Sequence, residues 1–163
     1  MKTFKIFIKF ILITILIFGG IILIFSRLKE ETHFYKYNLK NEPWKNNVNI
    51  EFSIDPSAKY KTFLLLRHNS ALESKAILCK LSIKDSIDNR KNDTLKINFI
   101  DKNGKWEGKG LSLKTIILPI SKDSINLKKG HYKIGIVPLI MNQELKGIET
   151  IGIILKRNKF KKK

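Results

Sequence analysis

The chain has 163 residues, of which 43% are apolar and 10% aromatic, so its composition excludes a disordered protein and suffices for one globular domain. Its formal charge of +18 comes from 28 lysines and only 4 arginines. Nucleic-acid surfaces favour arginine for bidentate contacts, so the charge makes nucleic-acid binding unlikely and favours a solvated basic surface.

An uncharged run from Phe10 to Phe25 stands near the start of the chain. It gives about 24 Å of helix, and extension back to Ile6 brings it close to the ~30 Å hydrocarbon core of a bilayer. A cleaved signal peptide is the alternative, but a cut after Gly20 places Phe18 where a small residue is needed. We therefore predict that residues 1–26 are an uncleaved transmembrane helix, a signal-anchor. A slight excess of positive charge favours an N-terminus inside.

Residues 27–46 are polar with scattered aromatic residues and predict a tether or a first edge strand. From residue 47 to 157 the pattern is one of strands separated by turns. Apolar residues alternate in Val48–Ile54, Ile77–Ile83, Leu95–Phe99, Tyr132–Ile136 and Ile151–Leu155.

Three further features complete the pattern. Phe63–Leu66 is apolar at successive positions, which is typical of a strand buried on both faces. Leu111–Ile120 indicates another strand, and Pro138 predicts an edge or a bulge because proline cannot donate to a ladder. The whole predicts an all-β protein: an antiparallel β-sandwich of about seven to eight strands over residues 47–157, preceded by one N-terminal transmembrane helix. Residues 158–163 form a basic tail.

No catalytic or cofactor motif is evident in the sequence. His33, His68 and His131 lie too far apart along the chain for metal-ligand spacing. No Gly-x-Ser-x-Gly, phosphate-binding loop or Cys-x-x-Cys occurs. Cys79 is the only cysteine, so it can form no internal disulfide, and its alternating run predicts a small buried hydrophobe. We predict no enzymatic activity, no metal and no cofactor.

The segment Gly104–Gly110 follows a tight turn that begins at Asp101 and carries an aromatic residue, Trp106, at its centre. One interpretation is a recognition loop at the rim of the sandwich. The other is a turn with a bulge, in which Trp106 caps the core and the glycines allow close approach. The possible partner-binding residues are Trp106, Glu107, Arg67 and Trp44. Arg67 stands at the end of an apolar strand, where an arginine is more often an ion-pair residue than a ligand. Trp44 follows Pro43 and is also suited to packing the first strand onto the core.

Three blocks of sequence occur in a characteristic order: FLLLRHN at 63–69, DTLKINFIDKNGKWEGKG at 93–110 and LKGIETIGIILKR at 145–157. In this order they resemble the gliding-motility lipoprotein GldH family of Bacteroidetes, over about residues 34 to 157. The resemblance implies an exported, membrane-attached β-domain without known enzymatic activity. It also implies a role in gliding and an association with the type IX secretion apparatus.

Two departures from the family pattern are visible. The family carries a lipobox cysteine after its signal peptide, whereas residues 21–31 read IILIFSRLKEE. An uncleaved helix would then replace the lipid anchor. The family also tends to carry a Tyr-Pro-Phe-Ser-like stretch after the Arg-x-Asn strand end, where this chain has Ser70–Ser74. Both departures fit a member that has lost gliding and kept a secretion or envelope role.

These observations leave three hypotheses of function. The first is a non-catalytic envelope protein, single-pass in the inner membrane with its domain outside the cytoplasm, that binds other motility or secretion proteins. The second is a membrane-anchored carbohydrate- or peptidoglycan-binding sandwich that uses Trp44 or Trp106 as a stacking platform. The third, favoured least, is a cytosol-facing tether for nucleic acid or lipid.

Overall fold

The computed structural model of the protein describes residues 14–20, 31–40, 42–85, 90–140 and 144–158. The chain divides into two compact units, residues 1–31 and 32–163. Residues 14–20 of the first unit are helical, and the described residues contain no helix that is long and apolar enough to cross a membrane. Residues 1–13 and 21–26 of the predicted anchor lie outside the described residues.

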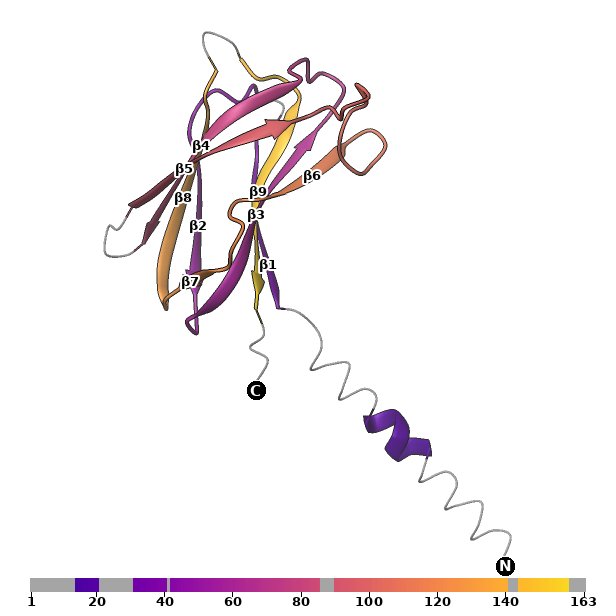
Figure 1. Cartoon of the computed structure of the whole chain (residues 1–163), viewed down its shortest axis with the longest axis vertical. Coiled ribbons are helices and arrows are strands. Elements are labelled where there is room, and N and C mark those ends of the chain that lie inside the picture. Colours follow the sequence, from indigo (N-terminus) through magenta and orange to yellow (C-terminus); the bar gives the residue numbers. More distant parts are fainter. Residues whose placement is uncertain (1–13, 21–30, 41, 86–89, 141–143, 159–163) are drawn as a thin grey trace, which may run out of the picture. The chain divides into compact units, whose positions relative to one another are not determined.

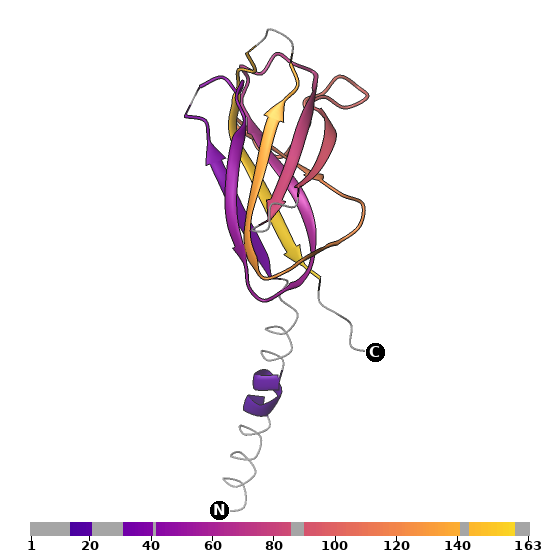
Figure 2. The same cartoon turned by 90° about the vertical axis from the view of Figure 1, so that its left-hand side faces the viewer.

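The second unit is an antiparallel β-sandwich of two sheets, as Figures 1 and 2 show. Its strands are β1 (Thr32–Asn38), β2 (Val48–Ile54), β3 (Ala58–His68), β4 (Ala76–Asp85), β5 (Arg90–Asn98), β6 (Lys114–Pro119), β7 (Ile125–Leu127), β8 (Gly130–Pro138) and β9 (Ile148–Arg157). The larger sheet has the order β1-β9-β3-β6, with β7 also paired to β3, and the smaller sheet has the order β2-β8-β4-β5. The predicted sandwich is confirmed, and the short β7 accounts for a strand beyond the expected number.

Neighbouring strands run antiparallel, so the connections gather at two opposite ends of the sandwich. Thr32 pairs with Lys156, which places the start of β1 beside the finish of β9. At the other end lie the connections that follow β1, β3, β5 and β8 (Figure 1). We call this the distal end, because it is opposite to the end at which the chain enters and leaves the sandwich.

The core lies between the sheets and follows the alternation in the sequence. Strand β2 buries every second residue without exception, and Ile77, Cys79 and Leu81 of β4 are likewise buried. Each large apolar side chain that is removed from water in this way contributes about 1.5–3 kcal/mol. The prediction for Phe63–Leu66 also holds at its centre, where Leu64, Leu65 and Leu66 are all buried although they point to alternate faces.

Two predicted details differ from the structure. The strand expected from Leu111 begins only at Lys114, and Leu111 is 99% exposed. Leu111 lies outside the strand because Lys109 and Thr115 pair through their backbones, which leaves residues 110–113 as the loop between them. Pro138 marks no edge: β8 lies between β2 and β4, and the proline is its last residue, where a missing donor matters least.

The flanks of the sandwich are tied to it by hydrogen bonds. Within residues 27–46, for which the sequence allows a tether or a first edge strand, Thr32–Asn38 form the edge strand β1, which pairs with β9. At the other flank, the backbone amide of Asn158 donates to the Lys59 carbonyl at 2.8 Å. Its side-chain amide donates to the Ser124 hydroxyl at 2.7 Å. The rest of the predicted basic tail, residues 159–163, lies outside the described residues.

Candidate partner-binding site at the distal end

The Trp106 loop is built by the turn that follows β5. The Asp101 carboxylate accepts hydrogen bonds from the backbone amides of Asn103 at 2.8 Å and Lys105 at 2.9 Å. Gly104 occupies the left-handed region, at φ +77°, where a side chain would be strained. The returning chain pairs with the outgoing one, because the Glu107 amide donates to the Phe99 carbonyl at 2.7 Å. The Asp-x-x-Gly sequence therefore fixes where Trp106 stands.

The Trp106 ring rests on a buried histidine from the other sheet. Its centroid lies 5.7 Å from that of His68, which is 2% exposed and also packs edge-on against Phe99 at 5.6 Å. The His68 Nε2 lies 3.3 Å from the Glu107 carbonyl oxygen, so the histidine ties β3 to the loop. Trp106 is half-buried in consequence, and the Glu107 side chain is exposed beside it.

The two glycines after Glu107 bring the loop back against β6. Lys109 and Thr115 exchange backbone hydrogen bonds of 3.0 and 2.9 Å. A Cβ atom on Gly108 would lie 2.9 Å from the Thr115 carbonyl oxygen, so only glycine fits there. The close approach expected from these glycines thus serves to hold the Trp106 loop in place.

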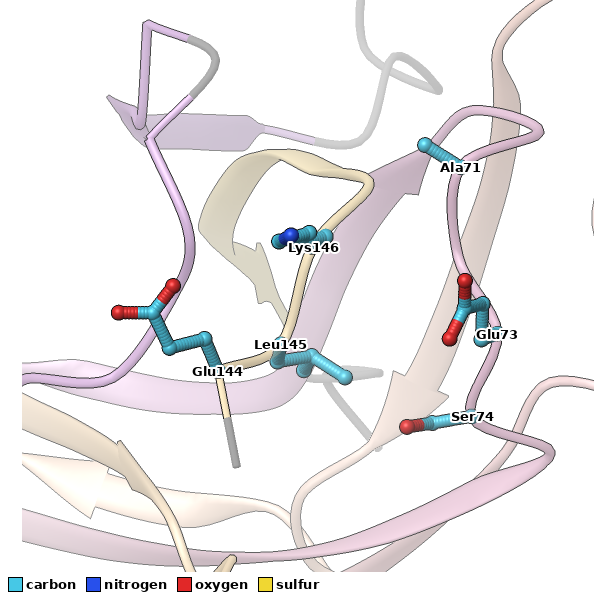
Figure 3. A pocket seen from close by; sticks show the side chains of 6 residues that line it. All are labelled: Ala71, Glu73, Ser74, Glu144, Leu145 and Lys146. Atoms are coloured by element: carbon cyan, nitrogen blue, oxygen red, sulfur yellow. The ribbon is translucent and has the colours of Figure 1, made fainter. Parts of the chain in front are cut away.

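A polar pocket of about 520 Å³ opens at the same end of the sandwich. Figure 3 shows that its side chains come from two segments, the connection after β3 and the connection before β9. It is lined by Ala71, Glu73, Ser74, Glu144, Leu145 and Lys146. Lys45 lies 3.0 Å from Glu144, so the rim carries both signs of charge. Ser70–Ser74 stands out in the sequence only as a departure from the family pattern, and its proximity to residues 144–146 involves positions too distant in sequence to be predicted.

The four residues named from the sequence occupy different environments. Trp106 and Glu107 lie together on the Trp106 loop. Arg67 is half-buried and precedes His68 on β3, so its side chain points to the outer face of the sheet while that of His68 points inward. The Arg67 Nε is buried with no hydrogen-bond partner among the described residues. Trp44 is 1% exposed and donates from its Nε1 to the Asn46 carbonyl at 3.0 Å, so its indole packs the core and offers no surface to a partner.

The described residues contain no group of His, Cys, Asp or Glu side chains placed to hold a metal ion. Cys79 is fully buried, and desolvation raises the pKa of its thiol from 9.0 to about 12. The thiol is therefore protonated at neutral pH and is no nucleophile.

The three sequence blocks singled out above meet in space around His68 and Asn69. His68 contacts Glu107 of the middle block. The Asn69 amide donates to the Gly147 carbonyl at 2.9 Å, and its side chain donates to the Glu149 carboxylate of the last block. Asn69 also folds its own turn, since its side-chain oxygen accepts from the Ala71 amide at 2.8 Å. These blocks together shape the distal end, a convergence that sequence order alone did not reveal.

The chain is remotely similar to several solved structures. Eiger TNF from S. frugiperda is 7% identical, with 80% of this chain and 93% of that one covered, at a TM-score of 0.43. A family 35 carbohydrate-binding module from Clostridium thermocellum is 12% identical, with 75% and 90% covered, at a TM-score of 0.37. The CBM35 of Cellvibrio japonicus Abf62 is 10% identical, with 78% and 99% covered, at a TM-score of 0.38. Likenesses this remote carry no argument about function.

Comparison with sequences is more decisive. No curated protein matches the chain. The family model of the GldH lipoprotein, in contrast, matches residues 32–155, from the first residue of β1 to Leu155 in β9. The match takes in nearly the whole sandwich, the first two blocks that meet at the distal end, and the third block as far as Leu155. The chain belongs to the GldH lipoprotein family.

Proposed function

We propose that this protein is a non-catalytic component of the cell envelope whose distal end binds other motility or secretion proteins. Family membership supports an envelope protein. We further propose that the hydrophobic run Phe10–Phe25 anchors it as a single-pass inner-membrane protein with the sandwich outside the cytoplasm, because residues 21–31 offer no cysteine for a lipid. The test of the anchor is the intact mass of the mature protein. The full mass supports the anchor, whereas an N-terminus between residues 20 and 27, or incorporation of labelled palmitate, contradicts it.

The observation that carries the binding function is the location of the exposed features. The pocket and the Trp106 loop lie at the end opposite to Thr32, where the chain enters the sandwich. Strand β3 has 11 residues, which span about 36 Å at ~3.3 Å each. A protein held through its N-terminal residues therefore presents these features about one strand length from the point of attachment. A half-buried tryptophan whose base is fixed by His68 also suits an interface anchor, since little entropy is lost when it binds.

The test is site-specific photo-crosslinking of the full chain in its native membrane. A photoreactive residue at Glu107 should form adducts with envelope proteins, and one at Asp123, an exposed residue at the opposite end, should not. Glu107→Lys should reduce recovery of the same proteins, while Asp123→Lys, which changes the net charge equally, should leave it intact. Equal adducts from both positions, or none from either, would contradict a binding role for the distal end.

A second candidate function is binding of carbohydrate or peptidoglycan. Its support is the polar lining of the pocket, where Glu73, Ser74 and Lys146 offer groups that can hydrogen-bond sugar hydroxyls. With Trp44 buried, only Trp106 remains as a stacking platform. The test is a pull-down of the protein on isolated peptidoglycan. Binding by the wild-type chain that is lost in Glu73→Ala and in Trp106→Phe would favour this candidate over the first, if position 107 also forms no protein adducts.

A further inference from the structure

The outer face of the larger sheet carries apolar side chains where an antiparallel sheet usually meets water with polar ones. The register aligns Phe34 of β1 with Ile154 of β9, Ile154 with Phe63 of β3, and Phe63 with Pro119 of β6. In the next row Leu65 and Ile117 stand side by side. We call these six residues, Phe34, Phe63, Leu65, Ile117, Pro119 and Ile154, the apolar face.

The apolar face has a packed centre and exposed flanks. Phe34 and Ile117, on the two outer strands, are 57% and 52% exposed. Ile154 and Leu65, on the two inner strands, are only 2% and 7% exposed although they point away from the core. Leu65 lies over Gly152 of β9, where its Cδ2 is 3.5 Å from the position a Cβ would take. The absence of a side chain at residue 152 therefore leaves room for Leu65 to lie flat against the sheet.

The other sheet of the same sandwich provides an internal comparison. The outward positions of β2, β8, β4 and β5 include Asn49, Gly135, Ser82 and Asn92, which share one row. In the row beside it, Lys133 pairs with Glu51 at 3.2 Å. That face is the solvated one that the fold leads us to expect, so the apolar face does not follow from the architecture.

The charged side chains at the outward positions beside the apolar face are cations. Its outward neighbours on β1, β3 and β9 include Lys36, Lys61, Arg67 and Lys156, and Lys156 Nζ lies 5.5 Å from the centroid of the Phe63 ring. Along the outward positions of β1, β3, β6 and of β9 from Thr150 to Lys156, the sequence places no aspartate or glutamate. A second copy of this chain would oppose these cations with the same cations, which disfavours self-association through this face.

We propose that the apolar face and its cationic border dock a protein partner that presents an apolar centre ringed by carboxylates. The proposal rests on the proposed function, that the domain binds envelope proteins, and adds a lateral surface distinct from the distal end. The four strands lie ~4.8 Å apart, and the four rows of outward residues from Lys61 to Arg67 of β3 lie ~6.8 Å apart. The apolar face and its border therefore measure roughly 14 by 20 Å between their outermost residues, about 300 Å². This is below the ~800 Å² per partner of a standard stable interface, so it fits a small, reversible contact. A protein fits this surface better than a lipid, because Leu65 and Ile154 lie flush with their neighbours and do not project into a bilayer.

The first part of the test locates the contact. Photoreactive residues are placed singly at Phe34 and Ile117, and, as a matched control, at Leu78, which is 46% exposed on the outer face of the other sheet. In the native membrane, positions 34 and 117 of the full chain should form adducts with one envelope protein, through a peptide rich in Asp and Glu, and position 78 should not. The adduct yield should fall several-fold between 0.1 and 0.5 M salt, because charge pairs at an interface rim are screened.

The second part tests the chemistry of recognition. The double variant Phe34→Ser/Ile117→Ser should fold normally, since both side chains are more than half exposed, and should lose the partner. Lys36→Glu/Lys61→Glu should lower the yield at a position-34 crosslinker at least ten-fold. Lys80→Glu/Lys84→Glu, an equal change of charge on the other sheet, should leave it unchanged.

Four outcomes would overturn the proposal. Adducts of positions 34 and 117 with lipid would make the face a membrane contact, and adducts with a second copy would make it a dimer interface. Protein adducts at position 107 with none at 34 or 117 would refute the lateral surface and leave the proposed function intact. No protein adduct at any position would refute both.

Discussion

Trp44 provides the sharpest test of the fold, because the sequence allowed it either a binding or a packing role. Its side chain is 1% exposed, and replacing a buried tryptophan by alanine costs about 3–5 kcal/mol. The hydrogen bond from Nε1 to the Asn46 carbonyl adds up to about 1 kcal/mol, since Asn46 is exposed and water can take the place of the donor. We therefore expect Trp44→Ala to lower the free energy of unfolding by about 4 kcal/mol. That is a large part of the roughly 6–20 kcal/mol expected for a domain of about 130 residues.

The measurement is urea unfolding followed by circular dichroism, on residues 32–163 and on the full chain. The slope of free energy against urea should be unchanged, because the mutation leaves the surface exposed on unfolding nearly the same. Trp106→Ala is the matched comparison: its side chain is half-buried, so its cost should be about half as large. A loss below about 1 kcal/mol for Trp44→Ala, or a larger loss at Trp106 than at Trp44, would refute the assignment of Trp44 to the core.

Three further predictions follow from buried or strained positions. Burial raises the pKa of the Cys79 thiol from 9.0 to about 12, so between these two pH values the unfolded chain loses the thiol proton and the folded chain keeps it. In this pH range the free energy of unfolding should therefore fall by ~1.4 kcal/mol per pH unit relative to that of Cys79→Ala. Parallel pH profiles of the two proteins would contradict this. The chain has two tryptophans, so Trp106→Phe leaves only the buried Trp44, whose fluorescence acrylamide should quench poorly. Trp44→Phe leaves only the half-buried Trp106, whose fluorescence acrylamide should quench more strongly. Stronger quenching of Trp44 than of Trp106 would contradict the burial of Trp44. Gly147 has φ +82° and a Cβ there would lie 2.3 Å from the Leu72 amide nitrogen, so Gly147→Ala should cost about 3 kcal/mol or more by thermal unfolding. Gly104→Ala, at φ +77° in open space, should cost only about 1 kcal/mol, and equal losses would show that the clash is relieved.

Local periodicity predicted which residues face the core, because side chains alternate along any strand whatever its neighbours are. Val48–Ile54 and Ile77–Leu81 needed no tertiary information for this reason. The alternation does not tell which strands pair, so no sequence pattern shows that Phe34, Phe63 and Ile117 lie across one face. The apolar character of Leu111 predicts a strand, whereas the backbone pairing of Lys109 with Thr115 places Leu111 in a loop.

The candidate site likewise combines features that depend on local sequence with features that depend on contacts between distant segments. The position of Trp106 follows from a turn four residues long, which is a local property. Its support by His68, 38 residues earlier in the chain, depends on the packing of one sheet against the other. The burial of Trp44 is less local still, because its backbone amide binds the Leu145 carbonyl at 2.9 Å, about a hundred residues away. A pocket formed by residues 71–74 and 144–146 is out of reach of sequence patterns for the same reason.

The antiparallel pairing of β1 with β9 has a mechanical consequence. Seven residues of β1 are in register with β9, from Thr32 to Asn38. If the chain is pulled at residue 31 while a partner holds the distal end, the force runs along the strands. The hydrogen bonds of β1 are then loaded together in shear. A sideways pull on the same residue would instead open the edge strand one pair at a time, starting from Thr32 and Lys156. The sandwich should therefore resist tension best along the line from its attachment to its distal end.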